Sequence, residues 1–289
     1  MDTIALHLSG LAGRTRQNRM YTLRTWRAHC ASNCVPPEGA ARADIDTWIA
    51  HRRDSGIGPR TICTDLAHLA AYYRWLVETG RRGDDPTALI LRPRRGHSTR
   101  PWLGRDDART LLDASLEWEG GELAAQVHLW LLSGLRPGEP RMLRVEDLSA
   151  HDGAPTLRVR ASKTPGTETL VIPETTARIL HARRAGRERG PLLLDPRTGR
   201  PWTGARERRR FHQLREAAGV PYVTPAGLRV SMITLAISSG IPERDVSVAA
   251  RHSSTAITAR YDRLRTHMES PVGPRLAAWI AHGGDTLAP

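Results

Sequence analysis

The sequence predicts a mainly helical protein with two domains, the second of which contains a small β-hairpin. Three observations support this class. Apolar residues recur every three or four positions in most of the chain, a basic stretch rich in proline and glycine divides it, and two short alternating segments flank a turn. With 289 residues the chain has room for two domains and a sizeable buried core.

The first domain, residues 1–92, is expected to contain three or four helices. Helical spacing of apolar residues predicts helices over residues 14–30 and 41–53, the first of them rich in arginine. A third helix begins near Pro59 and ends at Gly80. Its apolar stripe, which predicts a face packed on a core, consists of Ile62, Leu66, Leu69, Tyr73 and Leu76.

A basic linker is predicted over residues 93–101, at the end of a longer stretch rich in proline, glycine and arginine. Its arginines, Arg94, Arg95 and Arg100, could follow a DNA phosphate backbone while the domains hinge about the linker. A solvated charged loop explains any one of these arginines about as well.

The second domain, residues 102–289, is expected to be helical around one hairpin. A helix with two aspartates in its first turn is followed by a strongly apolar helix over residues 123–132. Residues 156–160 and 169–173 alternate as strands and flank a turn that contains Lys163. After Pro173 the pattern is helical again, and a tail helix is predicted over residues 269–282.

The charge of the chain indicates a polyanionic partner. Lysine and arginine outnumber acidic residues 43 to 30, which gives a net charge of +13 and a pI near 11.0. Nucleic acid is the first expectation and an acidic membrane surface the second, although an arginine-rich solvated surface is an equally good explanation of composition alone. No apolar run approaches the roughly 20 residues that span a bilayer, and the N-terminus does not resemble a secretory signal. We therefore expect a cytoplasmic protein without a membrane partner.

The cysteines predict neither disulfides nor a metal centre. There are three of them, an odd and small number that suits a reducing compartment. Cys30 and Cys34 lie beside His29, but the sequence offers no second cysteine pair to complete a zinc site. We expect no metal and no cofactor.

Two arginines stand in segments that could present a guanidinium to an anion. Arg136 lies in the string SGLRPGE, where glycine and proline favour an exposed turn and Glu139 is placed to orient it. Arg229 lies one turn inside a helix that Thr224 caps and Pro225 opens. Near the positive end of a helix an arginine gains nothing from the dipole, so an anion is a plausible partner. Each arginine alone is more often a surface residue.

Three further residues could carry proton-transfer or nucleophilic chemistry. Lys163 is the only lysine among 43 basic residues, and lysine can release a proton where arginine cannot. His252 precedes Tyr261 in the string HSSTAITARY, whose small and hydroxylated residues allow close approach to a phosphate backbone. A turn lysine in solvent and a packed tyrosine are the ordinary explanations of these residues taken singly.

Taken together, these residues resemble the tyrosine recombinase (phage integrase) family, with a Xer-like two-domain architecture. Three strings carry the resemblance in the family's order: SGLRPGE with LRVEDL, VTPAGLR, and HSSTAITARY. The resemblance covers nearly the whole chain. It implies a helical core-binding domain, which binds DNA, and a catalytic domain of helices with a small sheet.

The resemblance also implies a metal-free cleavage of DNA. Arg136 and Arg229 would hold the non-bridging phosphate oxygens, and His252 would hydrogen-bond the same phosphate. Tyr261 would attack the phosphorus and form a 3′-phosphotyrosyl link, while Lys163 would protonate the leaving 5′-oxygen. The family implies double-stranded DNA as partner and a tetramer on it, either of one chain or with a related recombinase. It also implies a place at the nucleoid.

The sequence departs from the family pattern at three positions. Ala226 stands where the second box usually has histidine or lysine, Val230 where a second histidine often follows, and Arg251 where glycine usually precedes the third-box histidine. Loss of a general acid–base group costs about 10²–10⁴ in rate. We expect Arg251 to bind DNA beside the phosphate and to compensate partly for this loss.

Three alternatives remain open at this point: a relative that binds DNA but cleaves it poorly or not at all, a helix-turn-helix regulator, and a relaxing enzyme similar to a type IB topoisomerase.

Overall fold

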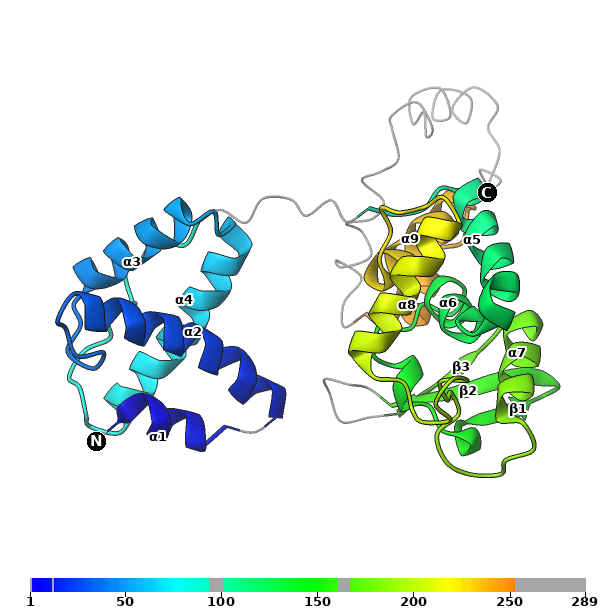
Figure 1. The fold of residues 1–289 in the computed structure, drawn as a ribbon, viewed down its shortest axis with the longest axis horizontal. Coiled ribbons are helices and arrows are strands. Elements are labelled where there is room, and N and C mark those ends of the chain that lie inside the picture. The colour runs from blue at the N-terminus through cyan, green and yellow to red at the C-terminus, as the bar shows by residue number, and fades with distance from the viewer. Residues whose placement is uncertain (1, 12, 94–100, 161–166, 253–289) are drawn as a thin grey trace, which may run out of the picture. The chain divides into compact units, whose positions relative to one another are not determined.

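The computed structural model describes residues 2–11, 13–93, 101–160 and 167–252 (Figure 1). The chain divides into two compact units, Met1–Thr99 and Arg100–Pro289. Both are built mainly from helices, and the second unit also contains one small sheet. This is the predicted fold class.

The described part of unit 1 consists of α1 (Thr3–Ser9), α2 (Gly13–Ser32), α3 (Arg42–Asp54) and α4 (Pro59–Glu78). The three helices predicted from apolar spacing are found within two residues of their expected bounds. Helix α1 was not predicted, because seven residues are too few for a periodic pattern. It begins where the Asp2 side chain accepts a hydrogen bond from the amide of Ala5, at 3.1 Å.

The core of unit 1 is aromatic. Trp26 of α2 packs edge-on against Trp48 of α3, with ring centroids 5.4 Å apart, and Tyr72 packs edge-on against Tyr73 within α4. Such edge contacts suit the charge distribution of aromatic rings. The stripe predicted for α4 is buried, so the three longer helices enclose one core.

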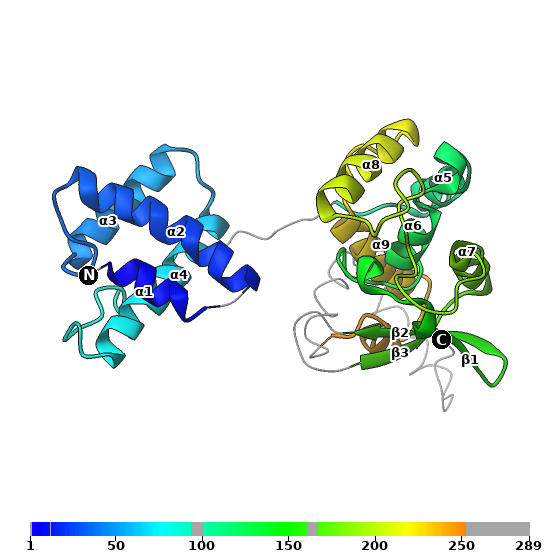
Figure 2. The ribbon, with the colours of Figure 1, turned by 60° about the horizontal axis from the view of Figure 1, so that its bottom comes forward.

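Unit 2 is organised around a buried central helix, α6 (Ala124–Leu131), which packs against three helices: α5 (Arg105–Glu117), α7 (Glu174–Arg184) and α9 (Pro225–Ser238). The other helices are α8 (Gly204–Ala217) and α10 (Glu243–Ala249). Short 3₁₀ turns occupy Trp118–Gly121, Pro140–Met142 and Val145–Asp147. Figure 2 shows the sheet beneath these helices.

The sheet has three antiparallel strands in the order β1 (Leu148–His151), β2 (Ala154–Arg160) and β3 (Thr167–Val171). Strands β2 and β3 are the predicted hairpin, and Val159 pairs with Glu168 in their register. The prediction missed β1, a four-residue strand with no buried side chain and therefore no alternation to detect. The turn that carries Lys163 lies outside the described residues.

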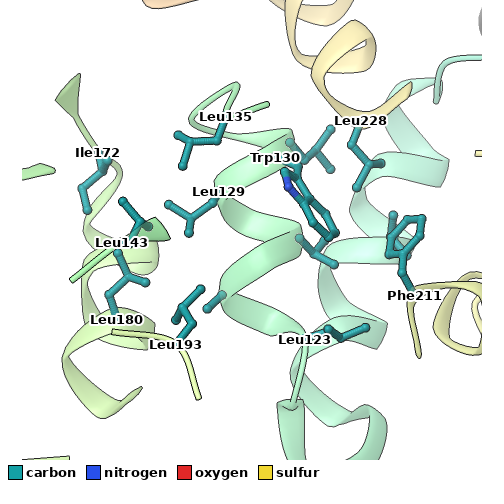
Figure 3. Packing of buried hydrophobic residues seen from close by; sticks show 14 of the residues in the cluster. Leu123, Leu129, Trp130, Leu135, Leu143, Ile172, Leu180, Leu193, Phe211 and Leu228 are labelled. Carbon is teal, nitrogen blue, oxygen red and sulfur yellow. The ribbon is translucent and has the colours of Figure 1, made fainter. Parts of the chain in front are cut away.

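Helix α6 places its apolar side chains in the middle of the unit 2 core (Figure 3). On one side Leu129 lies toward Ile172 and Leu143, and on the other Trp130 lies toward Leu228 of α9. Trp130 also meets Phe211 of α8 edge-on, with ring centroids 5.5 Å apart. This packing fixes the end of α6, from which the loop carrying Arg136 begins.

In the parts of the chain that the structure describes, no helix is both long and apolar enough to cross a membrane.

Candidate active site

The loop after α6 begins with a glycine that no other residue replaces easily. Gly134 has φ +60°, a left-handed conformation, and a Cβ placed on it would overlap the Cε atom of Met232 on α9. The amide of the next residue, Leu135, donates to the carbonyl of Leu129, at 3.0 Å. The loop therefore turns back sharply over α9 before it presents Arg136.

Glu139 positions Arg136 through hydrogen bonds to its backbone and to its side chain. Its side chain is fully buried, and its Oε2 accepts from the backbone amide of Arg136 at 2.6 Å. Its Oε1 accepts from Nη1 of the same arginine at 3.0 Å. The Arg136 side chain is 36% exposed, so it remains partly accessible although a carboxylate holds it. This is the orientation that the sequence analysis expected from Glu139.

Helix α9 supplies Arg229. The Thr224 side chain accepts from the amide of Gly227 at 3.0 Å and Pro225 opens the helix, as predicted. One turn later, Arg229 donates from Nη1 to the carbonyl of Gly134 and from Nη2 to the carbonyl of Ala250. A single guanidinium thus joins the loop before Arg136 to the segment before His252.

Helix α10 ends just before His252 in a turn that contains one residue with a left-handed backbone conformation. The amide of Arg251 donates to the carbonyl of Val248 at 2.8 Å, and the amide of His252 donates to the carbonyl of Ser247 at 3.1 Å. This pair of bonds is the Schellman arrangement, in which the first residue past the cap is left-handed. Arg251 takes that position, with φ +53°. The turn stops α10 and brings His252 beside the two arginines.

Burial and positive charge keep His252 neutral. Desolvation lowers the pKa of its imidazole, and the nearby cations Arg229 and Arg136 lower the pKa further, to about 4. At neutral pH the ring carries one donor nitrogen and one acceptor nitrogen. It can therefore donate a hydrogen bond without adding charge.

The site has an excess of positive charge. Among the described residues, the guanidinium groups of Arg136 and Arg251 contact the buried carboxylate of Glu139, and the half-exposed carboxylate of Glu168 lies 3.7 Å from Arg251. Arg229 adds a third guanidinium beside them. Arg136 also donates from Nη2 to the carbonyl of Arg251 at 3.2 Å, so Arg136 and Arg229 contact the same turn. Such a cluster suits a bound anion, and planar guanidinium groups suit a phosphate.

A match to a protein-family profile over most of unit 2 establishes the family of this chain. The profile of the phage integrase family matches residues 101–268, more than half of the chain. The chain belongs to the phage integrase family. The tyrosine recombinase XerC of Chlorobaculum parvum is 26% identical over 260 residues, which span 78% of this chain and 76% of that protein. The XerC of Mycobacterium bovis is 27% identical over 266 residues, spanning 87% of this chain and 88% of that protein.

Solved structures of integrases share the fold. A lambda integrase dimer bound to a COC' core site has a TM-score of 0.71 at 19% identity, covering 89% of this chain and 92% of that chain. The Tn1549 transposon integrase in complex with transposon right end DNA has a TM-score of 0.74 at 15% identity, covering 96% of this chain and all of that chain. Together with the family match and the XerC relatives, they make this chain a tyrosine recombinase, an enzyme of site-specific DNA recombination, rather than a helix-turn-helix regulator.

The structure brings together four of the predicted site residues of this integrase, namely Arg136, Glu139, Arg229 and His252. Five others lie outside the described residues: Arg94, Arg95, Arg100, Lys163 and Tyr261.

The placement of Arg251 requires a correction. We expected its side chain to bind DNA beside the phosphate, but that side chain is 3% exposed and donates from Nη2 to Glu139 at 2.6 Å. A buried guanidinium that is paired with a carboxylate does not face a DNA backbone. Glu168 of β3, whose carboxylate is 3.7 Å from Nε of Arg251, was not among the predicted site residues. Nothing local in the sequence links Glu168 to Arg251.

Two positions of α9 at which the family resemblance implied a different residue lie at different depths. Ala226 lies half-buried in the first turn of α9, three residues before Arg229. Val230 is 6% exposed and belongs to the packed part of that helix. A polar side chain is therefore easier to place at residue 226 than at residue 230.

Proposed function

We propose that this tyrosine recombinase cleaves double-stranded DNA at the cluster formed by Arg136, Arg229 and His252. The observation that carries the proposal is the contact of both arginines with the turn that ends at His252. A phosphodiester under attack gains negative charge on its non-bridging oxygens, and fixed cations stabilise that charge most when they are already in place. Glu139 and the two backbone carbonyls would hold these cations before DNA binds.

Tyr261 would be the nucleophile and Lys163 the general acid. The Tyr261 phenol gives its proton to water, and the phenolate oxygen attacks phosphorus. The P–O bond to the 5′-oxygen breaks, and the 5′-oxygen takes a proton from the Lys163 ammonium. The product is a 3′-phosphotyrosyl link and a free 5′-hydroxyl. Attack by the 5′-hydroxyl of a second strand reverses the step, so the chemistry needs no cofactor and no external energy source.

Residues 1–92 and the basic linker at 93–101 would bind the duplex next to the cleavage site. The net charge of +13 supports a DNA partner, because phosphate contacts dominate the affinity of such proteins. A lambda integrase structure is described as a tetramer bound to a Holliday junction. By analogy, four protomers of this chain, or of this chain and a related recombinase, would act together on DNA at the nucleoid in the cytoplasm.

The test is covalent trapping on a nicked suicide duplex, with candidate sites drawn from the DNA that flanks the gene. We expect a protein–DNA adduct that survives denaturation with the wild-type chain and is absent with Tyr261→Phe. Specific binding without any adduct would identify a relative that has lost cleavage, the alternative that Ala226 favours. Relaxation of supercoiled plasmids without sequence preference would instead indicate a topoisomerase-like enzyme.

A further inference from the structure

We propose that Arg251 is a positioning residue: its side chain fixes Glu139 and thereby Arg136, and its main chain forms the turn that presents His252. The inference rests on the proposed function for its effect on catalysis. Its structural part concerns only contacts among described residues and can be tested without DNA.

The backbone of Arg251 takes a conformation that favours glycine. A left-handed residue other than glycine costs about 1–2 kcal/mol, and the position after a helix cap is where glycine is most common. Arg251 nevertheless occupies this position, with φ +53°. Its side chain is not exposed as a solvated arginine would be, since only 3% of it is accessible. The contacts of that side chain therefore offset the backbone strain.

Those contacts complete the partners of a buried carboxylate. Glu139 Oε2 accepts from the Arg136 amide and from Nη2 of Arg251, each at 2.6 Å, while Oε1 accepts from Nη1 of Arg136 at 3.0 Å. Without Arg251, the carboxylate would be balanced by Arg136 alone. The Glu139 carboxylate would then neutralise the Arg136 guanidinium, and less of the positive charge of Arg136 would act on a phosphate.

The main chain of Arg251 contacts the same arginine. Its carbonyl accepts from Nη2 of Arg136 at 3.2 Å, so one residue contacts Arg136 directly through its backbone and indirectly through Glu139. The next residue in the chain is His252. A shift of the Arg251 side chain would therefore move Arg136 and His252 together.

The charged groups around this carboxylate set the expected pH dependence. Arg136 faces Glu139 from its own loop and Arg251 from the end of α10, and Glu168 of β3 lies 3.7 Å from Nε of Arg251. Burial alone would raise the pKa of Glu139, but the bonds from Arg251 and Arg136 outweigh burial and lower that pKa below its ordinary value. Removal of the Arg251 guanidinium should raise the pKa of Glu139.

The first experiment is a double-mutant cycle in the full-length chain. Urea unfolding at pH 7 is compared for wild type, Arg251→Met, Glu139→Gln and the double variant. We expect the double variant to depart from the product of the two single effects by roughly tenfold in the unfolding equilibrium constant, within the range for residues in contact. Independent effects would overturn the assigned contact, whether or not the protein cleaves DNA.

The second experiment measures adduct formation on a suicide duplex as a function of pH. Arg251→Gly relieves the backbone strain yet lacks the guanidinium, so we expect a stable protein that cleaves up to about 100-fold more slowly, the cost of misplacing a catalytic group by about 1 Å. The acid limb of the profile should move to higher pH in Arg251→Gly and Arg251→Met, and less in Arg251→Lys. Arg244→Met removes the same charge from an exposed position on α10 and should leave rate and profile unchanged.

If Arg251→Gly forms the adduct at the wild-type rate and the acid limb of its pH profile does not move, the catalytic part of the proposal is wrong. A wild-type chain that forms no adduct on any duplex would count against the proposed function instead, and the cycle between Arg251 and Glu139 would still decide the positioning contact.

Discussion

Arg136 and Arg229 donate to consecutive carbonyl oxygens, those of Arg251 and Ala250, immediately before His252. The two arginines are 93 positions apart in the sequence, yet both contact one turn. Because that turn also ends α10, the position of His252 depends on both guanidinium groups. The contacts that assemble this cluster all lie within the described part of unit 2.

His252 should titrate far below an ordinary histidine. Burial and the charges of Arg229 and Arg136 lower its pKa from 6.5 to about 4. Since the unfolded chain takes up this proton first, the free energy of unfolding should decline as the pH falls from 6.5 toward 4. Adding a DNA duplex should raise the pKa of His252, because phosphate charge opposes that of the arginines. Imidazole NMR measures both values, and a pKa near 6.5 in the free protein would contradict the placement of His252.

Replacing Arg229 with lysine should impair both stability and cleavage. One ammonium cannot reproduce the two bonds that Arg229 makes to the carbonyls of Gly134 and Ala250. We expect about a 100-fold loss of adduct formation, the magnitude for losing a charge-stabilising donor. Arg215→Lys is the control, because Arg215 also donates to a backbone carbonyl, that of Val223, at 2.6 Å. A similar loss of cleavage in both variants would mean that Arg229 acts through stability alone.

Gly134→Ala should destabilise unit 2. The substitution combines a left-handed backbone with an overlap between the new methyl group and Met232. We expect a cost of about 1–2 kcal/mol from the left-handed backbone, with a smaller addition from displacing the Cε end of Met232, and a melting temperature lower by about 2–8 °C. Gly153→Ala is the matched control, since Gly153 also has a positive φ but open space around it. A lower melting temperature for Gly134→Ala than for Gly153→Ala would measure the cost of displacing Met232, and wild-type melting temperature in Gly134→Ala would contradict the left-handed backbone of Gly134.

Ala226→His should speed cleavage if a missing proton acceptor is what limits the enzyme. Residue 226 is half-buried at the start of α9, three residues before Arg229, and one acid–base group is worth about 10²–10⁴ in rate. Adduct formation on a suicide duplex measures the gain, and Ala226→Gln controls for the added bulk. An unchanged rate would show that residue 226 does not limit the reaction.

The elements predicted well are those with a long local pattern. Helix α4 has a five-residue apolar stripe and a proline at its start, and its predicted bounds match closely. Helix α1 and strand β1 were missed because seven and four residues carry too little periodicity. The three-stranded sheet around the predicted hairpin is therefore the main addition that the structure makes to the fold.

The site also has features that the sequence predicted and features that only the structure shows. Arg136, Arg229 and His252 were singled out from motifs and a family resemblance, because no local pattern connects residues so far apart. The support that Glu139 gives Arg136 is local, three residues away, and was expected. The burial of Arg251 was not, since its left-handed backbone and its distant carboxylate partner are tertiary features that sequence spacing does not encode.

The most direct test of the account is to identify the amino acid that becomes joined to DNA. A suicide duplex is incubated with the wild-type chain, the denatured adduct is digested with protease, and the nucleotide-bearing peptide is sequenced by mass spectrometry. We expect a 3′-phosphate on Tyr261 and no adduct with Tyr261→Phe or when both Arg136 and Arg229 are replaced. A link to any other residue, or an adduct of undiminished yield without the two arginines, would contradict it.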